Sequence, residues 1–214
     1  MGFADLLLIV HRAVTRALQV AQERGKEYAE RGFADPVAEK GYRDFSRCAL
    51  NLLHAHHETE EAIIFPRLRP LLGSCPFGDL ETQHKEIVGA IDAATTALDA
   101  ADAGTAQSAW LDRFVPAIGR VRTAWTNHIA VEEVHITQPA IDKVMDGAAQ
   151  ADMAKTAAEH GQKHAHAPQL DIAFLLYNLG PDERAHLLFP PQLVSMVEGP
   201  WKEQWAPMKS LLLD

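Results

Sequence analysis

The sequence predicts an all-α protein, an up-down-up-down four-helix bundle followed by a C-terminal helical appendage. Three observations lead to this prediction. The first two-thirds of the chain contains four long segments with apolar residues at helical spacing and little sign of any strand. Turn and capping residues separate these segments. The two halves of this region also carry the same histidine pattern at a nearly constant offset.

The first two helices are delimited by capping and helix-breaking residues. We expect the first helix over residues 4–29, where apolar residues form one stripe. Asp35 is the expected N-cap of the second helix and Pro36 its first residue, where the missing N–H costs nothing. This helix should run to about Phe65, with Pro66 and Pro70 stopping it.

The third and fourth helices follow a turn that is rich in glycine and proline. Asp79 is the expected cap of the third helix, which should end near Gly104. The fourth helix is expected over residues 108–137, with a kink at Pro116. In such a bundle, the starts of the first and third helices and the ends of the second and fourth share one end.

The last part of the chain differs from the bundle. We expect residues 1–145 to form the bundle domain and residues 146–214 a helical extension packed on it. Its large apolar side chains would form an exposed patch unless the bundle or a partner subunit buried them. These side chains are Leu170, Phe174, Leu175, Trp201 and Trp205.

Composition excludes several classes of partner. A formal net charge of −9, with 20 Lys and Arg residues, argues against nucleic acid and anionic membranes. The apolar run 6–10 is too short to cross a bilayer and lacks the flanks of a secretory signal. Cys48 and Cys75 are isolated thiols, which is typical of a reducing compartment. We therefore expect a cytoplasmic protein.

Six residues form the repeated histidine pattern. Each half has a lone histidine near the start of its first helix and a His-x-x-x-Glu pair near the end of its second. The lone histidines are 73 residues apart, and both members of the pair recur after 72 residues. All of them should therefore lie at a similar height in the bundle. The six residues are His11, His56, Glu60, His84, His128 and Glu132.

These residue types at this spacing indicate a metal centre. A His and a Glu four residues apart lie on one face of a helix, about 6 Å apart along its axis. Two halves related by a pseudo-two-fold axis would bring four imidazoles and two carboxylates together, enough for two metal ions with bridging glutamates. This donor set favours a pair of iron ions, and the spacing alone leaves zinc and manganese open.

The register within the second helix has alternatives. His56 and Glu60 are preferred because they keep the 72-residue offset and continue an apolar stripe. Two other pairs have the same spacing, namely His57/Glu61 and His54/Glu58. His57 and Glu61 stay open as ligands or as hydrogen-bond partners of the ligands.

A ferritin-like bundle is the competing di-metal architecture. It requires Glu-x-x-His on two helices and a Glu on each of the other two. Glu81-x-x-His84 and Glu132-x-x-His135 meet half of this requirement, but they lie on consecutive helices and the first helix has no Glu near His11. We therefore reject this architecture. The other histidines are interpreted as solvated residues: His160, His164, His166 and His186.

Residues 56–66 resemble the second-helix signature of the hemerythrin-like, HHE cation-binding family. In that signature a His is followed at +4 by a Glu and at +9 and +10 by an aromatic residue and Pro. The resemblance covers about residues 5–140, and the other predicted ligands fall where the family keeps its own. It implies a four-helix bundle with a non-haem di-iron centre that reacts with dioxygen, hydrogen peroxide or nitric oxide.

Two departures separate this chain from the oxygen-carrying hemerythrins. Those proteins keep a second His in the third helix, four residues after the first, where this chain has Val88. Their fourth-helix carboxylate is an Asp five residues after the His, whereas Glu132 follows His128 by four. The pattern resembles the bacterial branch of the family, and the missing fifth histidine argues against reversible oxygen transport.

The expected function is therefore binding or turnover of a small oxidant, in a response to oxidative or nitrosative stress or in oxygen or iron sensing. Whether the protein is an enzyme stays open. The alternative is a metal-binding or redox-sensing module without turnover, whose appendage acts through a partner.

Overall fold

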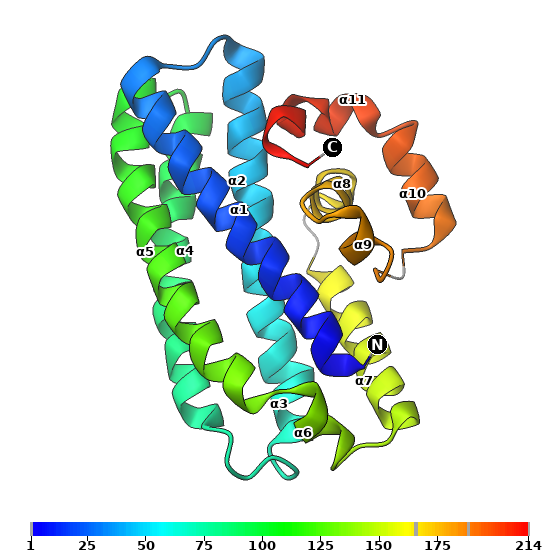
Figure 1. Cartoon of the computed structure of the whole chain (residues 1–214). Helices are drawn as coiled ribbons and strands as arrows, with labels where there is room; N and C mark the ends of the chain where they lie inside the picture. Colours follow the sequence, from blue (N-terminus) through cyan, green and yellow to red (C-terminus); the bar gives the residue numbers. More distant parts are fainter. Residues whose placement is uncertain (1, 165–166, 188, 214) are drawn as a thin grey trace.

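The computed structural model describes residues 2–164, 167–187 and 189–213, and over these residues the chain is all-α with no strand. Four long helices form a bundle (Figure 1), which confirms the predicted fold class. The connections between the first two and between the last two of these helices lie at one end of it. The bundle helices are α1 (Phe3–Arg31), α2 (Pro36–Thr59), α4 (Phe77–Asp102) and α5 (Gln107–His135).

The helix starts follow local capping chemistry. Asp35 caps α2 as predicted, because its carboxylate accepts a hydrogen bond of 2.8 Å from the backbone N–H of Ala38. Helix α4 begins at Phe77 with Pro76 at its N-cap, three residues before the predicted cap, so Asp79 lies in its first turn. There its negative charge still complements the helix dipole. Helix α5 continues through Pro116.

The end of α2 differs in part from the prediction, because Pro66 does not stop the helical path, which ends at Leu68, two residues before Pro70. The helical path continues through a π-helical turn, η1 (Glu60–Ile64), and a short helix, α3 (Phe65–Leu68). The backbone N–H of Phe65 donates to the carbonyl oxygen of Glu60, five residues back. Pro66 then lies in the first turn of α3, where a missing N–H is tolerated. Turns of this kind often occur at functional sites.

One large hydrophobic core runs through the bundle and extends into the C-terminal region. Fully buried aromatic residues fill much of the interior of the bundle. Among them the hydroxyl of Tyr42 donates a hydrogen bond of 2.6 Å to the carbonyl oxygen of Ala21, which satisfies its polar atom. The largest members are Trp110, Trp125, Tyr42, Phe45 and Phe114.

The C-terminal region packs along one side of the bundle, mainly against α2 (Figure 1). Phe174 and Trp205 are buried in the shared core, and Leu170, Leu175 and Trp201 are partly buried. His166 lies outside the described residues. The elements after α5 are α6 (Gln138–Asp142), α7 (Gly147–Lys163), α8 (Pro168–Tyr177), α9 (Pro181–Arg184), α10 (Pro191–Glu198), α11 (Lys202–Trp205) and the 3-10 helix η2 (Ala206–Leu211).

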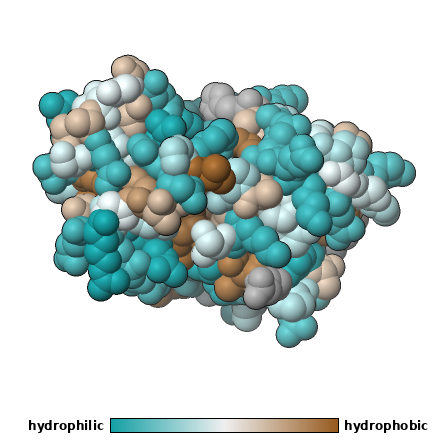
Figure 2. Space-filling model, turned by 90° about the horizontal axis from the view of Figure 1, so that it is seen from above, coloured by the Kyte–Doolittle hydropathy of each residue, from teal (hydrophilic) through white to brown (hydrophobic). Residues whose placement is uncertain are grey.

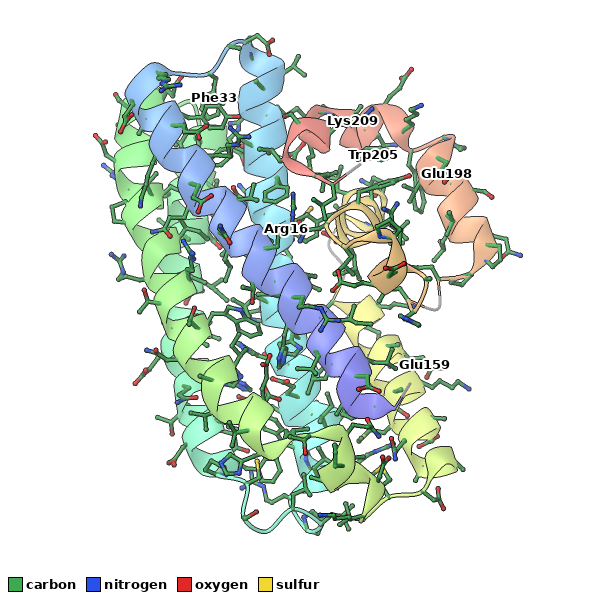
Figure 3. All side chains as sticks on the ribbon, in the orientation of Figure 1. Arg16, Phe33, Glu159, Glu198, Trp205 and Lys209 are labelled. Carbon is green, nitrogen blue, oxygen red and sulfur yellow. The ribbon has the colours of Figure 1, made fainter. Side chains whose placement is uncertain are left out.

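Polar contacts fasten this region to α1. The side-chain amide of Asn178, which is buried, donates a hydrogen bond of 2.6 Å to the carbonyl oxygen of Ala13. Arg16 projects from α1 toward the same region (Figure 3) and donates to the side chain of Asn178 and to the carbonyl oxygen of Leu211. The bundle and the extension are therefore joined by hydrogen bonds as well as by apolar packing.

The surface carries no large apolar area on the face drawn in Figure 2, where apolar side chains form small separate patches among hydrophilic ones. Within the described residues, none of the helices combines the length and the apolar character needed to cross a bilayer.

Candidate metal centre

The structure brings all six predicted residues together in the interior of the bundle. His11 comes from α1, His56 from α2 and Glu60 from η1, while α4 supplies His84 and α5 supplies the last pair. None of the six is more than 7% exposed, and both glutamates are fully buried.

The side chains form two adjacent groups that share Glu60. Within each group, one ligand atom of every residue lies within 4.8 Å of the others. The first group is His11, His56, Glu60 and Glu132, and the second is His57, Glu60, His84 and His128.

The two glutamates connect the groups. Glu60 directs one oxygen to Nε2 of His56 at 3.1 Å and the other to Nε2 of His84 at 3.3 Å. Oε2 of Glu132 lies 3.2 Å from Nε2 of His128 and 3.4 Å from Nε2 of His11. Each carboxylate therefore faces one imidazole from each half of the bundle.

The donor atoms lack partners within the protein. Both oxygens of Glu60 and Glu132, and Nε2 of His11 and His56, are buried without a hydrogen bond. Nε2 of His84 faces Nε2 of His128 at 3.3 Å. Buried polar atoms, and carboxylates above all, are costly unless something compensates them. Metal cations bound between these oxygen and nitrogen donors would compensate them, so the residues present fit a pair of metal ions.

The outward nitrogens of three imidazoles are held by hydrogen-bond acceptors. Nδ1 of His11 lies 2.9 Å from Oε1 of Glu133, and Nδ1 of His84 lies 2.9 Å from Oε1 of Glu61. Nδ1 of His128 lies 3.2 Å from Oε1 of Gln83. A partner on Nδ1 fixes the ring and leaves Nε2 free to bind a metal.

Burial favours the neutral form of three of the imidazoles, which is the form that metal binding requires. Desolvation holds the pKa of His56 and of His57 well below the ordinary value and lowers the pKa of His84 to about 4. For Glu60, desolvation and then the charge of Glu132 raise the pKa well above its usual range.

The pKa of Glu132 is shifted in the opposite direction to that of Glu60. Although burial raises it, the polar contact with His128 and the electrostatic influence of His11 and His56 lower the pKa of Glu132 to about 2. Without a cation, the two neighbouring carboxylates thus favour having one charge between them.

His57 is the residue that the preferred register left aside. It is 3% exposed and belongs to the second group, with its ring stacked on that of His84 at a centroid distance of 4.0 Å. Two features of the sequence could have indicated His57: it is adjacent to His56, and Val88 stands where the oxygen-carrying hemerythrins keep a second histidine in the third helix. His54 belongs to neither group, and Glu58 is exposed. The carboxylate of Glu61 is hydrogen-bonded to Nδ1 of His84.

Two aromatic residues border the site: Trp125, which the sequence pattern did not single out, and Phe65, the aromatic residue of the second-helix signature. Trp125 is fully buried, lies edge-on to His11 at 5.2 Å between ring centroids, and donates to the hydroxyl of Thr15. Phe65 stacks on His84 at 5.4 Å. Trp125 precedes His128 by three residues on the same helix face, so its position could have been inferred from spacing. These rings shield the centre from water.

Comparison with known proteins identifies the bundle. Residues 3–138, well over half of the chain, match the family described as "Hemerythrin HHE cation binding domain". Neither the curated proteins nor the solved structures include a match to this chain.

Proposed function

Because this chain belongs to the hemerythrin HHE cation-binding family, we propose that it holds two iron ions and binds or reacts with a small oxidant. Dioxygen, hydrogen peroxide and nitric oxide are the candidates, in a cytoplasmic response to oxidative or nitrosative stress or in oxygen or iron sensing. The observation that supports this proposal most is the set of buried, unpartnered oxygens of Glu60 and Glu132 between imidazoles from both halves.

The role of each residue would follow from its position in the site. His11, His56, His84 and His128 would be terminal ligands. Glu60, which belongs to both groups, and Glu132, which contacts one imidazole of each group, would be shared between the metals. An iron pair supplies electron transfer and Lewis acidity. The protein supplies the orientation of the imidazoles through their Nδ1 partners and a dry, aromatic surround.

Metal content and optical spectrum test this proposal. We expect about two irons per chain in protein from iron-replete cells, with the absorption of a bridged ferric pair. Replacing both shared carboxylates, in Glu60→Gln with Glu132→Gln, should abolish binding of the pair. The exposed Glu58→Gln on the same helix as His56 is the matched control and should keep it. One tightly bound zinc per chain would overturn the proposal.

A second candidate function has a specific observation in its favour. Helix α7 packs on η1, the turn that carries Glu60, and Nδ1 of His160 lies 3.1 Å from the hydroxyl of Thr59. A change at the metal centre could reach the C-terminal region through this contact, as a redox-sensing module without turnover would require. Consumption of peroxide or nitric oxide by the purified iron protein favours the first function. Redox-dependent protease sensitivity of residues 147–213 without consumption favours the second.

A further inference from the structure

The pseudo-symmetry of the site is broken at one residue. The repeat that relates His56 to His128 relates His57 to Ile129, which carries no donor atom. The second group of side chains therefore contains three imidazoles and the first contains two.

We propose that His57 is a fifth imidazole ligand, so that the two metal positions are unequal. His57, His84 and His128 would serve one position and His11 and His56 the other, with both glutamates shared. This inference rests on the proposed dinuclear centre and adds a ligand that neither the 72-residue repeat nor the family's usual third-helix histidine, here Val88, would supply.

The surroundings of His57 support a ligand role. Both of its ring nitrogens are buried without any hydrogen-bond partner, whereas Nδ1 of His84 and of His128 has one. A neutral imidazole always carries one N–H donor and one acceptor, and burying both unpaired costs their full desolvation. A Leu or Phe would pack there without that cost. Binding a metal would satisfy one of the two nitrogens.

The ring arrangement also places His57 beside the other two imidazoles of its group. Its centroid is 4.0 Å from that of His84 and 5.3 Å from that of His128, while His84 and His128 are 4.6 Å apart. The three rings therefore converge from α2, α4 and α5 on the side of Glu60 away from His11.

The unequal number of protein donors at the two metal positions determines where a small oxidant would bind. Three imidazoles and two shared carboxylates give one position five protein donors, whereas two imidazoles and the same carboxylates give the other only four. The position served by His11 and His56 would therefore keep the place for a small ligand. Trp125, whose ring lies 5.2 Å from His11 and 5.6 Å from His56, would border it.

The test uses the full-length protein loaded with ⁵⁷Fe. The wild type should hold about two irons per chain and give two Mössbauer doublets of equal area from inequivalent sites. His57→Phe keeps a ring against His84 but has no nitrogen, so it should lose one iron or bind it at least about tenfold more weakly. His54→Ala, a half-buried histidine one turn earlier in neither group, is the control and should match the wild type.

Imidazole rescue separates ligation from packing. His57→Ala should show the same loss of iron, and added imidazole should restore both the iron and the second doublet. This variant also decides the question if His57→Phe does not fold. Two irons with an unchanged spectrum in the folded His57→Phe protein, or in His57→Ala without imidazole, would overturn the inference and leave the dinuclear centre standing. A wild type without two irons would overturn the proposed function itself.

Discussion

Gly41 lies where the backbone of the C-terminal region passes close to α2, and we predict that Gly41→Ala weakens this contact. A Cβ atom added to Gly41 in α2 would lie 2.0 Å from the carbonyl oxygen of Pro207 and 2.5 Å from its carbon. These are backbone atoms of η2, so no side chain can rotate away. The segment itself must move by about 1.4 Å to restore an ordinary contact of 3.4 Å.

Two opposing effects set the size of the change. Replacing glycine by alanine inside a helix stabilises it by up to about 1 kcal/mol. Overpacking costs about 1–3 kcal/mol, and it would loosen Met208 and Leu211, which η2 buries in the shared core. We expect a net loss of about 1–2 kcal/mol, or a fall in Tm of about 2–8 °C for a chain of this size.

Gly89 provides the matched control. It lies on the exposed face of α4, and a Cβ atom there would meet nothing within 4 Å. Gly89→Ala should therefore raise Tm slightly, while Gly41→Ala lowers it and makes the segment around Trp205 (Figure 3) the first to be cleaved in limited proteolysis. A Gly41→Ala protein as stable as the wild type, with equal protection of this segment, would refute the close packing of η2 on α2.

Three further predictions concern the metal centre and the extension. Glu133→Gln should weaken metal binding about 10- to 100-fold by loosening His11, measured by competition with a chelator, and an affinity equal to that of Glu58→Gln would contradict the role of Glu133. Deleting residues 150–214 should lower Tm or cause aggregation, because Gln150 accepts from the backbone N–H of Phe3 and its neighbours share the core, yet the soluble fraction should still bind iron; an unchanged Tm would refute this. In the metal-free protein burial lowers the pKa of His84 to about 4, below its unfolded value of 6.5, so the folded state resists protonation, and the contribution of His84 to stability should be lost as the pH falls from 6.5 through 4. Urea unfolding across this range checks the sign, and equal stability at both ends would contradict it.

The sequence was sufficient to predict the bundle and to predict that six of its residues would lie close together, because both depend on periodic spacing. It was not sufficient for His57. Adjacent residues on a helix point about 100° apart, so spacing made His56 and His57 alternatives. In the bundle α2 faces α1 on one side and α4 on the other, and the two histidines serve different groups. That division depends on helix packing, which spacing within one helix does not contain.

The error at Pro66 has a similar cause. Proline ends an ordinary helix because its ring and missing N–H disrupt the pattern of hydrogen bonds four residues back. Here the π turn shifts that pattern by one residue before Pro66 is reached, and no residue type marks such a turn in advance. The same turn carries Glu60 and Glu61, so the irregular backbone and the candidate site coincide.

The 72-residue repeat also extends beyond the six predicted ligands, from Glu61 to Glu133. Glu61 belongs to the first half but holds His84 of the second, and Glu133 belongs to the second half but holds His11 of the first. Neither half could therefore orient its own lone histidine. Several inner donor atoms on α1, α2, η1 and α5 are buried without a hydrogen bond and would gain partners from bound metals, so metal binding and docking of the two halves should stabilise each other. Because each half supplies the glutamate that orients the lone histidine of the other half, the site can be complete only when both halves of the bundle are docked.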